Sequence, residues 1–237
     1  MKYRKLGGTD IDVPLIGLGT MTWGEQNNLE QACEQMDYAL SRGVNFFDAA
    51  EMYPVPPKAE TAGDTERCIG EWLSQSGKRS EITLATKVAG RADTRPDWKH
   101  IRGGPRLSRD HIRQAIEGSL ERLQTDYVDL WQVHTWDETT PLEETLGAMD
   151  YALSSGKARH VGVSNFSGWQ LARSATLQNP LFGKAPVLST QNEYSLLNRR
   201  VEREVLPACL ELDIGFLAWS PLGRGVLTGK YRSGLPS

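Results

Sequence analysis

The feature that most constrains the fold is an alternation of short apolar runs with longer amphipathic segments along the whole chain. Each short run is rich in aliphatic or β-branched residues, and the segment after it repeats its apolar residues with helical spacing. This alternation is typical of βα units that build a parallel sheet. The runs predicted to be strands are Leu15–Leu18, Val44–Phe47, Ile82–Thr86, Val128–Val133, His160–Val163, Leu188–Thr190 and Ile214–Ala218.

The segments between these runs are predicted helices. Asn28 can cap the first of them and Gly43 follows its end, while Ser108 can cap the helix that carries Ile112 and Leu123. Gly118 lies inside that second helix, where glycine costs about 1 kcal/mol relative to alanine, and it therefore suggests close packing. The other predicted helices span Thr65–Leu73, Leu142–Ser155, Gly168–Leu177 and Arg200–Leu212.

The chain begins with a pattern of another kind. Tyr3–Leu6 and Ile11–Pro14 flank the pair Gly7-Gly8 and alternate as a β-hairpin does. An open doubly wound sheet is the alternative to a barrel, but no G-x-G-x-x-G motif follows the first parallel strand. We therefore expect an α/β fold, a (β/α)8 TIM barrel with an N-terminal β-hairpin, as a single domain over residues 1–237.

An eight-stranded barrel needs one more βα unit than the sequence provides. The glycine-rich stretch Arg232–Ser237 stands where that unit would begin, so we expect a barrel that is incomplete at its C-terminus. Open sheet edges are aggregation liabilities. This expectation predicts low stability or an assembly that covers the edges, and it leaves a homo-oligomer as an option.

Composition excludes several classes of function. The chain has 27 basic and 30 acidic residues, a net charge of −3, so no basic field favours nucleic acid as a partner. It has no signal-peptide core and no run of eighteen apolar residues, which predicts a cytoplasmic protein without a membrane partner. Cys33, Cys68 and Cys209 are spaced for neither a disulfide framework nor a metal site.

Polar residues end six successive predicted strands. In a barrel, the carboxyl ends of the strands form the face that carries the active site. One such residue is commonly a turn former or a cap, but six in register are difficult to explain in that way. The residues are Asp48, Lys87, His134, Ser164, Asn165, Gln191, Trp219 and Ser220.

Asp48, Tyr53, Lys87 and His134 suit the reduction of a carbonyl group. A tyrosine can donate the proton, and a nearby ammonium group should lower its pKa from about 10 toward the working range. Asp48 can pair with the buried ammonium of Lys87, and His134 can hydrogen-bond the carbonyl oxygen. Singly, each residue has a structural explanation at least as good; together they favour catalysis.

A second group of residues suits a nicotinamide cofactor. Ser164, Asn165 and Gln191 offer amide and hydroxyl groups for a carboxamide, and Trp219 offers a flat face for the ring. Hydrogen bonding at the barrel rim and core packing are the structural alternatives. The segment up to Lys230 lacks the P-loop spacing, and it favours a loop of backbone donors facing a diphosphate.

Several runs of residues resemble the aldo-keto reductases, and within that family its Tas-like bacterial members. The runs are Gly17–Met21, Phe47–Tyr53, Thr86-Lys87, Asp126–Leu130, His134, Gly162–Phe166, Gln191-Asn192 and Trp219–Leu222. The resemblance implies NADPH as the cofactor, a small-molecule carbonyl substrate, and Tyr53, Asp48, Lys87 and His134 as the catalytic tetrad. It further implies cofactor contacts at Gly19, Thr20, Met21, Asp48, Ser164, Asn165, Gln191, Trp219, Ser220, Pro221, Leu222, Gly223 and Lys230.

The chain departs from the family in two places. Family members are longer and hold the adenosine 2′-phosphate with the additional part, so a preference for NADPH over NADH rests on the resemblance alone. The stretch between Val88 and Ser108, with Arg91, Arg95 and Arg102, is expected to be a flexible loop at the rim rather than a grip for an anionic substrate.

Two hypotheses compete with a reductase. The segment from Trp219 to Tyr231 is also similar to the β subunits of voltage-gated potassium channels, which suggests a nucleotide-sensing binding module. The other is that the chain is a fragment without activity.

Overall fold

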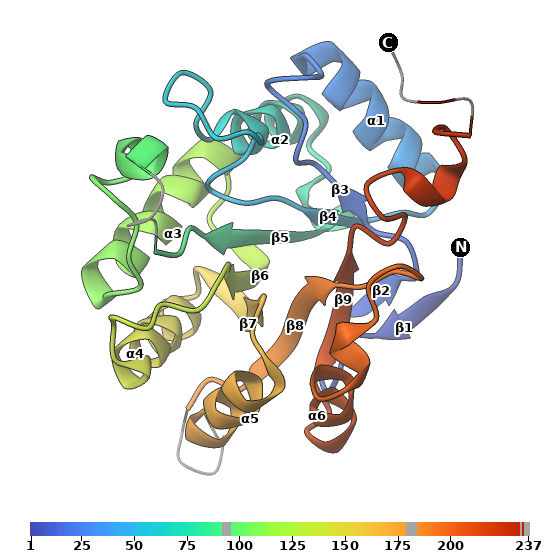
Figure 1. The fold of residues 1–237 in the computed structure, drawn as a ribbon. Coiled ribbons are helices and arrows are strands. Elements are labelled where there is room, and N and C mark those ends of the chain that lie inside the picture. Colours follow the sequence, from blue (N-terminus) through green and yellow to red (C-terminus); the bar gives the residue numbers. More distant parts are fainter. Residues whose placement is uncertain (92–95, 179–183, 233, 235–237) are drawn as a thin grey trace.

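The computed structural model describes residues 1–91, 96–178, 184–232 and 234. Its main feature is a seven-stranded parallel sheet in the order β3-β4-β5-β6-β7-β8-β9, which curls into a half-barrel (Figure 1). The strands are β3 (Leu18–Gly19), β4 (Phe46–Asp48), β5 (Thr83–Val88), β6 (Val128–Val133), β7 (Ala158–Ser164), β8 (Val187–Glu193) and β9 (Gly215–Trp219).

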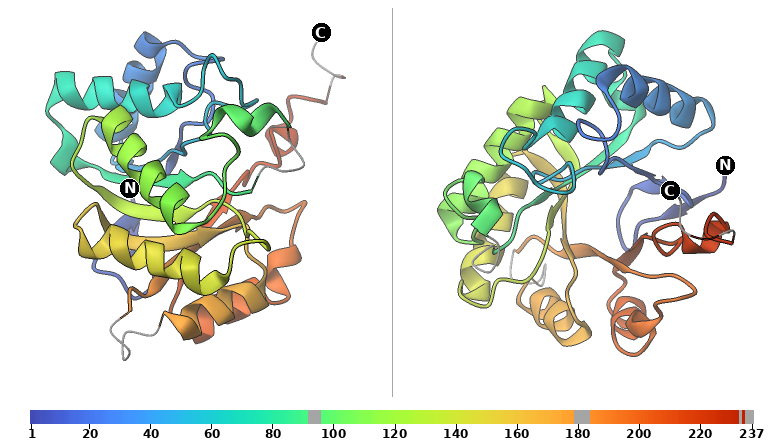
Figure 2. Two further views of the ribbon diagram at one scale, coloured as in Figure 1. Left: turned by 90° about the vertical axis from the view of Figure 1, so that its left-hand side faces the viewer. Right: turned by 45° about the horizontal axis from the view of Figure 1, so that its top comes forward.

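Helices follow the strands and cover the convex side of the sheet, so the concave side faces inward (Figure 2). The α-helices are α1 (Leu29–Ser41), α2 (Asp64–Ser76), α3 (Arg109–Leu123), α4 (Leu142–Ser154), α5 (Gly168–Leu177) and α6 (Val205–Glu211). Short 3-10 helices are η1 (Arg79–Glu81), η2 (Pro96–His100), η4 (Arg200–Glu202) and η5 (Val226–Thr228). This is the α/β architecture of a partial TIM barrel.

The predicted hairpin is confirmed. β1 (Tyr3–Lys5) and β2 (Asp12–Pro14) pair antiparallel, and the turn between them lies against the start of β9, where Gly8 N–H donates to Asp213 C=O. Leu6 and Val13 pack beneath the inner face of the half-barrel. The hairpin therefore forms a floor under the concave side.

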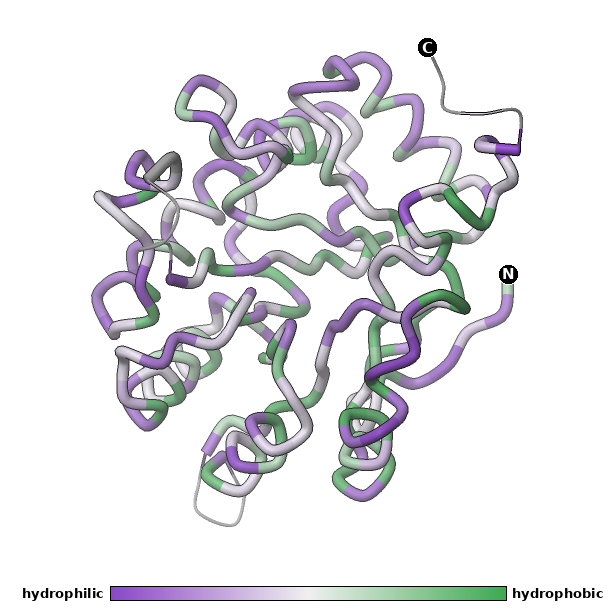
Figure 3. The backbone as a smooth tube through the Cα atoms, in the orientation of Figure 1, coloured by the Kyte–Doolittle hydropathy of each residue, from purple (hydrophilic) through white to green (hydrophobic). Residues whose placement is uncertain are grey.

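Hydrophobic packing divides into an outer and an inner region. The large core between the sheet and the helices includes Trp131 and Met149. Figure 3 shows hydrophobic stretches of the chain along the strands and on parts of the helices. A smaller cluster on the inner side joins Leu6 and Val13 of the hairpin to Phe46, Ala85 and Leu130 of the strands. The lower part of the half-barrel is thus apolar inside.

The first predicted strand is wrong in its placement. Leu15 and Ile16 do not join the parallel sheet: they are 50% and 61% exposed, and β3 begins only at Leu18. The physical reason is that Leu15 N–H donates to Lys2 C=O and so continues the hairpin. The remaining predicted strands are confirmed, β6 over the same residues and the others with ends shifted by one to three residues.

The predicted helices are confirmed, with differences in their caps and ends. Asn28 forms a capping box with Gln31 at α1, as its position suggested. Ser108 occupies the N-cap position of α3 without a capping hydrogen bond, and Glu144 of α4 accepts from another free N–H of the first turn, that of Arg109 (2.9 Å). The last helix is shorter than predicted, since the ring of Pro207 would clash with the carbonyl of Arg203 in a longer one.

Close helix packing occurs at a different glycine from the predicted one. A Cβ on Gly118 would meet only the Arg122 guanidinium, 3.0 Å away, and that group can move. A Cβ on Gly70 of α2 would lie 2.2 Å from the Arg122 carbonyl oxygen, which belongs to the α3 backbone. The contact between α2 and α3 therefore depends on Gly70.

No helix in the described ranges is long and apolar enough to cross a membrane.

Candidate active site

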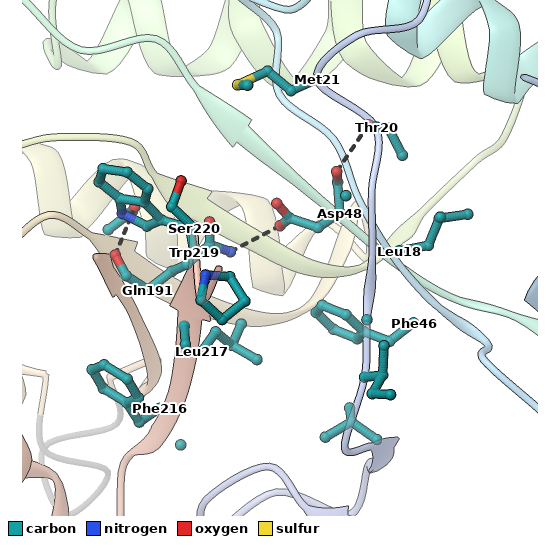
Figure 4. A pocket seen from close by; sticks show the side chains of 18 of the residues that line it. Leu18, Thr20, Met21, Phe46, Asp48, Gln191, Phe216, Leu217, Trp219 and Ser220 are labelled. Atoms are coloured by element: carbon teal, nitrogen blue, oxygen red, sulfur yellow. Dashed lines mark hydrogen bonds between the residues drawn. The ribbon is translucent and has the colours of Figure 1, made fainter. Parts of the chain in front are cut away.

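A cavity of about 810 Å³ opens on the concave side of the half-barrel. Its upper wall consists of residues from the carboxyl ends of the strands, and its lower part reaches Leu6 and Val13 of the hairpin, between the edge strands β3 and β9 (Figure 4). A volume near the upper end of the range for ligand pockets leaves room for a large ligand. The predicted site residues that line it are Gly19, Thr20, Met21, Asp48, Tyr53, His134, Ser164, Asn165, Gln191, Trp219, Ser220 and Pro221.

Asp48 ends β4 and forms an ion pair with Lys87 of β5. The Lys87 ammonium group is fully buried and lies 2.6 Å from Asp48 Oδ2 and 2.8 Å from the Ala49 carbonyl oxygen. Burial alone lowers the pKa of Lys87, but Asp48 and Tyr53 outweigh it, and the pKa is raised. Lys87 is thus a buried positive charge next to Asp48, behind the upper wall of the cavity. The predicted pairing of Lys87 with Asp48 is present.

Tyr53 lies in the loop after β4, held by a backbone bond from its N–H to the Ala50 carbonyl. The Lys87 Nζ atom is 5.1 Å from the centre of its ring. Burial raises the pKa of Tyr53, and this effect exceeds the lowering by the Lys87 charge. The expected net lowering of the Tyr53 pKa is therefore wrong for this structure, although the contribution of Lys87 has the expected sign.

His134 follows β6 and faces the ring of Tyr53 edge-on, with 5.8 Å between the ring centres. Burial, and next the charge of Lys87, lowers its pKa to about 3. The imidazole is therefore neutral near pH 7 and carries one N–H. Within the described part of the chain, its buried Nδ1 atom has no hydrogen-bond partner.

The amide side chains of the rim are already bonded to one another. Asn165 Nδ2 donates to the His134 carbonyl (3.0 Å) and to Ser164 Oγ (3.1 Å), while its Oδ1 accepts from Trp219 Nε1 (3.0 Å). Gln191 Nε2 donates to Asp48 Oδ1 (2.9 Å), and Ser164 Oγ donates to the Gln191 carbonyl (2.8 Å). This network joins the carboxyl ends of four strands, β6 to β9, and connects them to Asp48 of β4.

Residues near β3 complete the upper wall. Thr20 is buried and its hydroxyl donates to the Asp48 carbonyl oxygen (2.9 Å), as drawn in Figure 4. Met21 is 45% exposed, and its carbonyl accepts from Val55 N–H. A Cβ on Gly19 would meet nothing within 4 Å, so the cavity is open at that point.

Three predicted cofactor residues lie outside the cavity wall. Leu222, Gly223 and Lys230 belong to the loop after β9. Lys230 Nζ lies 5.0 Å from the centre of the Tyr231 ring and packs against Gly225. These three residues therefore lie in the loop itself and do not join the group of side chains around Asp48.

The loop after β5 is better anchored than its composition suggested. Arg91 pairs with Glu138 (2.9 Å), and Arg102 pairs with the buried carboxylate of Glu51, which also accepts from Ala89 N–H. Trp98 and Ile101 are buried against Met52, Tyr53 and Val55. Arg95 lies outside the described residues. Both described arginines are therefore engaged by protein carboxylates.

Gln132 was not predicted as a site residue. It and Asp129 are the two residues that interrupt the apolar run of β6. Gln132 is fully buried and its Nε2 lies 3.5 Å from Asp48 Oδ1. The available signal was its spacing, since a residue two positions before His134 points to the same face of a strand.

The geometry fits an organic cofactor better than a metal. Gly19 leaves open space, and Ser164, Asn165, Gln191 and Trp219 gather hydrogen-bonding groups and an aromatic face at one side of the cavity. A carboxamide can accept from and donate to such groups. Among the described residues, no group of three or more histidine, cysteine, aspartate or glutamate side chains could hold a metal ion.

Comparison with known proteins gives a consistent result. Residues 15–237 match the model of the aldo/keto reductase family. The chain is 40% identical to the protein Tas of Escherichia coli over 251 residues, 99% of this chain and 72% of that protein. It is 41% identical to the uncharacterized oxidoreductase YrpG of Bacillus subtilis, over 97% of this chain and 69% of that protein. A probable voltage-gated potassium channel subunit β from rice is 36% identical, over 99% and 68%.

Proposed function

Since the chain belongs to the aldo/keto reductase family, a family of NAD(P)H-dependent oxidoreductases, we propose that it reduces an aldehyde or ketone to an alcohol with NADPH. The observation that carries this proposal is the buried Asp48–Lys87 pair beneath Tyr53 and beside the neutral His134. Such a pair places a fixed positive charge where a tyrosine must release its proton.

Tyr53 is the proposed proton donor. When bound, a reduced nicotinamide would provide a hydride for the carbonyl carbon, so the carbonyl oxygen would need a proton from the protein. The raised pKa keeps the Tyr53 hydroxyl protonated at neutral pH, so the proton is present when it is needed. Lys87 stabilises the phenolate that remains, and Asp48 stabilises the charge of Lys87.

His134 is proposed to orient the carbonyl group. A neutral imidazole has one N–H, and with a pKa of about 3 it cannot compete with Tyr53 as a general acid at neutral pH. Its hydrogen bond can instead hold the oxygen beside the Tyr53 hydroxyl and share the developing negative charge. Tyr53 and His134 would thus both contact the carbonyl oxygen, Tyr53 as the proton donor and His134 as a hydrogen-bond donor.

The cofactor is proposed to be held by residues at the carboxyl ends of β7, β8 and β9, next to His134. Ser164, Asn165 and Gln191 would bind the carboxamide and Trp219 would lie against the ring, with Gly19, Thr20, Met21, Asp48, Ser220 and Pro221 alongside. Leu222, Gly223 and Lys230 would face the phosphates. Residues 1–237 are proposed to act as one domain, an incomplete barrel with seven parallel strands.

The test is binding and turnover in the same preparation. Quenching of tryptophan fluorescence measures NADPH and NADH affinity, and absorbance follows NADPH oxidation with an aromatic aldehyde. We expect tighter binding of NADPH and carbonyl-dependent oxidation. Tyr53→Phe should bind NADPH within about twofold of the parent but lose about 1,000-fold or more in kcat, as removal of an essential acid does.

The control is Tyr127→Phe, because Tyr127 lies on the lower side of the sheet between Arg79 and Arg159. It should retain full turnover. Equal turnover by Tyr53→Phe and the parent would contradict the assignment of the donor.

A nucleotide-binding module is the second candidate, favoured by the similarity to the rice channel subunit. It predicts NADPH binding without useful turnover. The absence of both binding and turnover would instead support the third hypothesis, an inactive fragment.

A further inference from the structure

Gln132 is a buried polar residue that the proposed mechanism leaves without a role. Its side chain is fully buried on β6, and the inner neighbour before it, Leu130, packs into the apolar floor. Burying an amide without hydrogen bonds costs free energy, so a leucine would suit this position better if only packing mattered. The choice of glutamine therefore needs a local explanation.

The backbone register places Gln132 directly beside the ion pair. Gln132 is the Cα partner of Lys87 on β5, and its Nε2 is directed toward Asp48 Oδ1 at 3.5 Å. The carboxylate can only accept hydrogen bonds, so the NH₂ end of the amide must face it. A distance of 3.5 Å is long, but catalytic hydrogen bonds are often long in ligand-free structures and shorten in complexes.

The carboxylate of Asp48 is divided between two kinds of donor. Oδ2 accepts from Lys87, whereas Oδ1 accepts from Gln191 and faces Gln132. Two amides on Oδ1 prevent the carboxylate from rotating and keep Oδ2 on the ammonium group. Gln191 lines the cavity, whereas Gln132 is fully buried and does not line it. Of the two amides, Gln132 is therefore the one that approaches Asp48 from the interior of the protein.

The neighbour of Gln132 on the next strand is Gly162 of β7. A Cβ at Gly162 would lie 3.4 Å from Gln132 Cγ, an ordinary contact, but only 2.2 Å from Ser189 Oγ and 2.9 Å from the Ser189 carbonyl oxygen. Gln132 and a Cβ at Gly162 would therefore pack without a clash, and the absence of a side chain at Gly162 serves the contact with β8.

We propose that Gln132 is a positioning residue, which fixes the Asp48 carboxylate from below and so sets the position of the Lys87 charge beneath Tyr53. This rests on the proposed function, because the role is defined by proton transfer from Tyr53. It differs from a contact with the cofactor, since Gln132 is buried beneath the cavity and outside its wall.

The test is a double-mutant cycle with Gln132→Met and Asp48→Asn, measured on kcat and on the free energy of unfolding. Methionine keeps the length of glutamine and removes its donor. We expect Gln132→Met to lower kcat about tenfold, the effect of one hydrogen bond to a charged group, with the Kd for NADPH unchanged. In the Asp48→Asn background the same change should cost less than about twofold.

A matched control is Gln178→Met. Gln178 is also buried and also donates to an aspartate, Asp150 (2.9 Å), but it lies among the outer helices. It should lower stability and leave kcat unchanged. Equal losses of kcat from Gln132→Met in both backgrounds would overturn the proposal, because they would show that Gln132 does not act through Asp48.

Gln132→Glu provides a readout that a packing role would not change. The carboxyl group introduced by this substitution can donate to Asp48 while it is protonated, whereas its ionised form repels Asp48. The ratio of variant to parent kcat should therefore fall as the pH rises from about 5 to about 8, and a constant ratio would overturn the proposal.

If the parent shows no turnover, the proposed function fails. The double-mutant cycle measured on the free energy of unfolding then still tests the contact between Gln132 and Asp48. Additive effects of Gln132→Met and Asp48→Asn on that free energy would show that the two side chains do not interact.

Discussion

At the scale of single residues, burial decides the charge states of His134 and Tyr53, whereas neighbouring groups decide that of Lys87. His134 is held neutral by burial, which Lys87 reinforces, while Lys87 keeps its charge only because Asp48 faces it at 2.6 Å. Tyr53 keeps its proton for the same reason that His134 loses one. Removing these side chains from water disfavours whichever form is charged.

The lowered pKa of His134 predicts a dependence of stability on pH. Its pKa is about 3 in the folded chain and about 6.5 when unfolded, so between these values the unfolded chain binds the extra proton. Its contribution to stability is therefore complete above a pH of about 6.5 and is lost as the pH falls toward 3. Between neutral pH and pH 5, the loss of unfolding free energy from this group should amount to about 2 kcal/mol.

The measurement is urea unfolding of the parent and of His134→Gln at about pH 7.5 and about pH 5. Subtracting the two curves removes the other titrating groups, since both proteins share them. The parent should lose more stability than the variant on acidification. Parallel losses would mean that His134 is protonated in the folded state.

At the scale of elements, strand ends were more predictable than helix contacts. Val128–Val133 could be predicted to the residue because a strand buried on both faces is mainly apolar, and only Asp129 and Gln132 interrupt this run. Leu15 and Ile16 have the same composition but continue the hairpin, which depends on a backbone bond to Lys2 that no local pattern encodes. The cap of α3 similarly comes from Glu144, which is distant in the sequence.

The pair Gly70 and Gly118 gives a test of the packing between α2 and α3. A Cβ on Gly70 would overlap the α3 backbone, so Gly70→Ala should destabilise the chain by about 3 kcal/mol. Gly118→Ala would meet only a guanidinium that can move, and it gains helix propensity, so its effect should remain within about 1 kcal/mol. Urea unfolding of both variants measures the difference. Similar costs for the two would show that α2 and α3 are not closely packed at Gly70.

At the scale of the whole molecule, a curled parallel sheet brings residues from distant parts of the chain to one rim. Asp48, Lys87, His134, Ser164 and Gln191 could be predicted as neighbours because parallel strands present their carboxyl ends at the same edge. Which of them bond to one another could not be predicted. Side-chain directions above the strands decide that Gln191 binds Asp48 and that Asn165 binds Trp219.

The half-barrel also determines where the cavity can extend. β3 and β9 are the edges of the seven-stranded sheet, and the cavity runs between them from Asp48 to the hairpin floor. The upper part carries the hydrogen-bonding side chains, and the lower part is lined by the apolar Leu6, Val13 and Phe46 together with Arg4 and Lys5 of the hairpin. The proposed chemistry is thus confined to the rim.

The most direct test of a carbonyl reductase is the transfer of hydride itself. The chain is incubated with an aromatic aldehyde and NADPH that carries deuterium at both C4 positions, and the alcohol is analysed by mass spectrometry. We predict an alcohol with one deuterium on its carbinol carbon from the parent, and about 1,000-fold less of it in the same time from Tyr53→Phe. Bound NADPH without any labelled alcohol from the parent would contradict the proposed function.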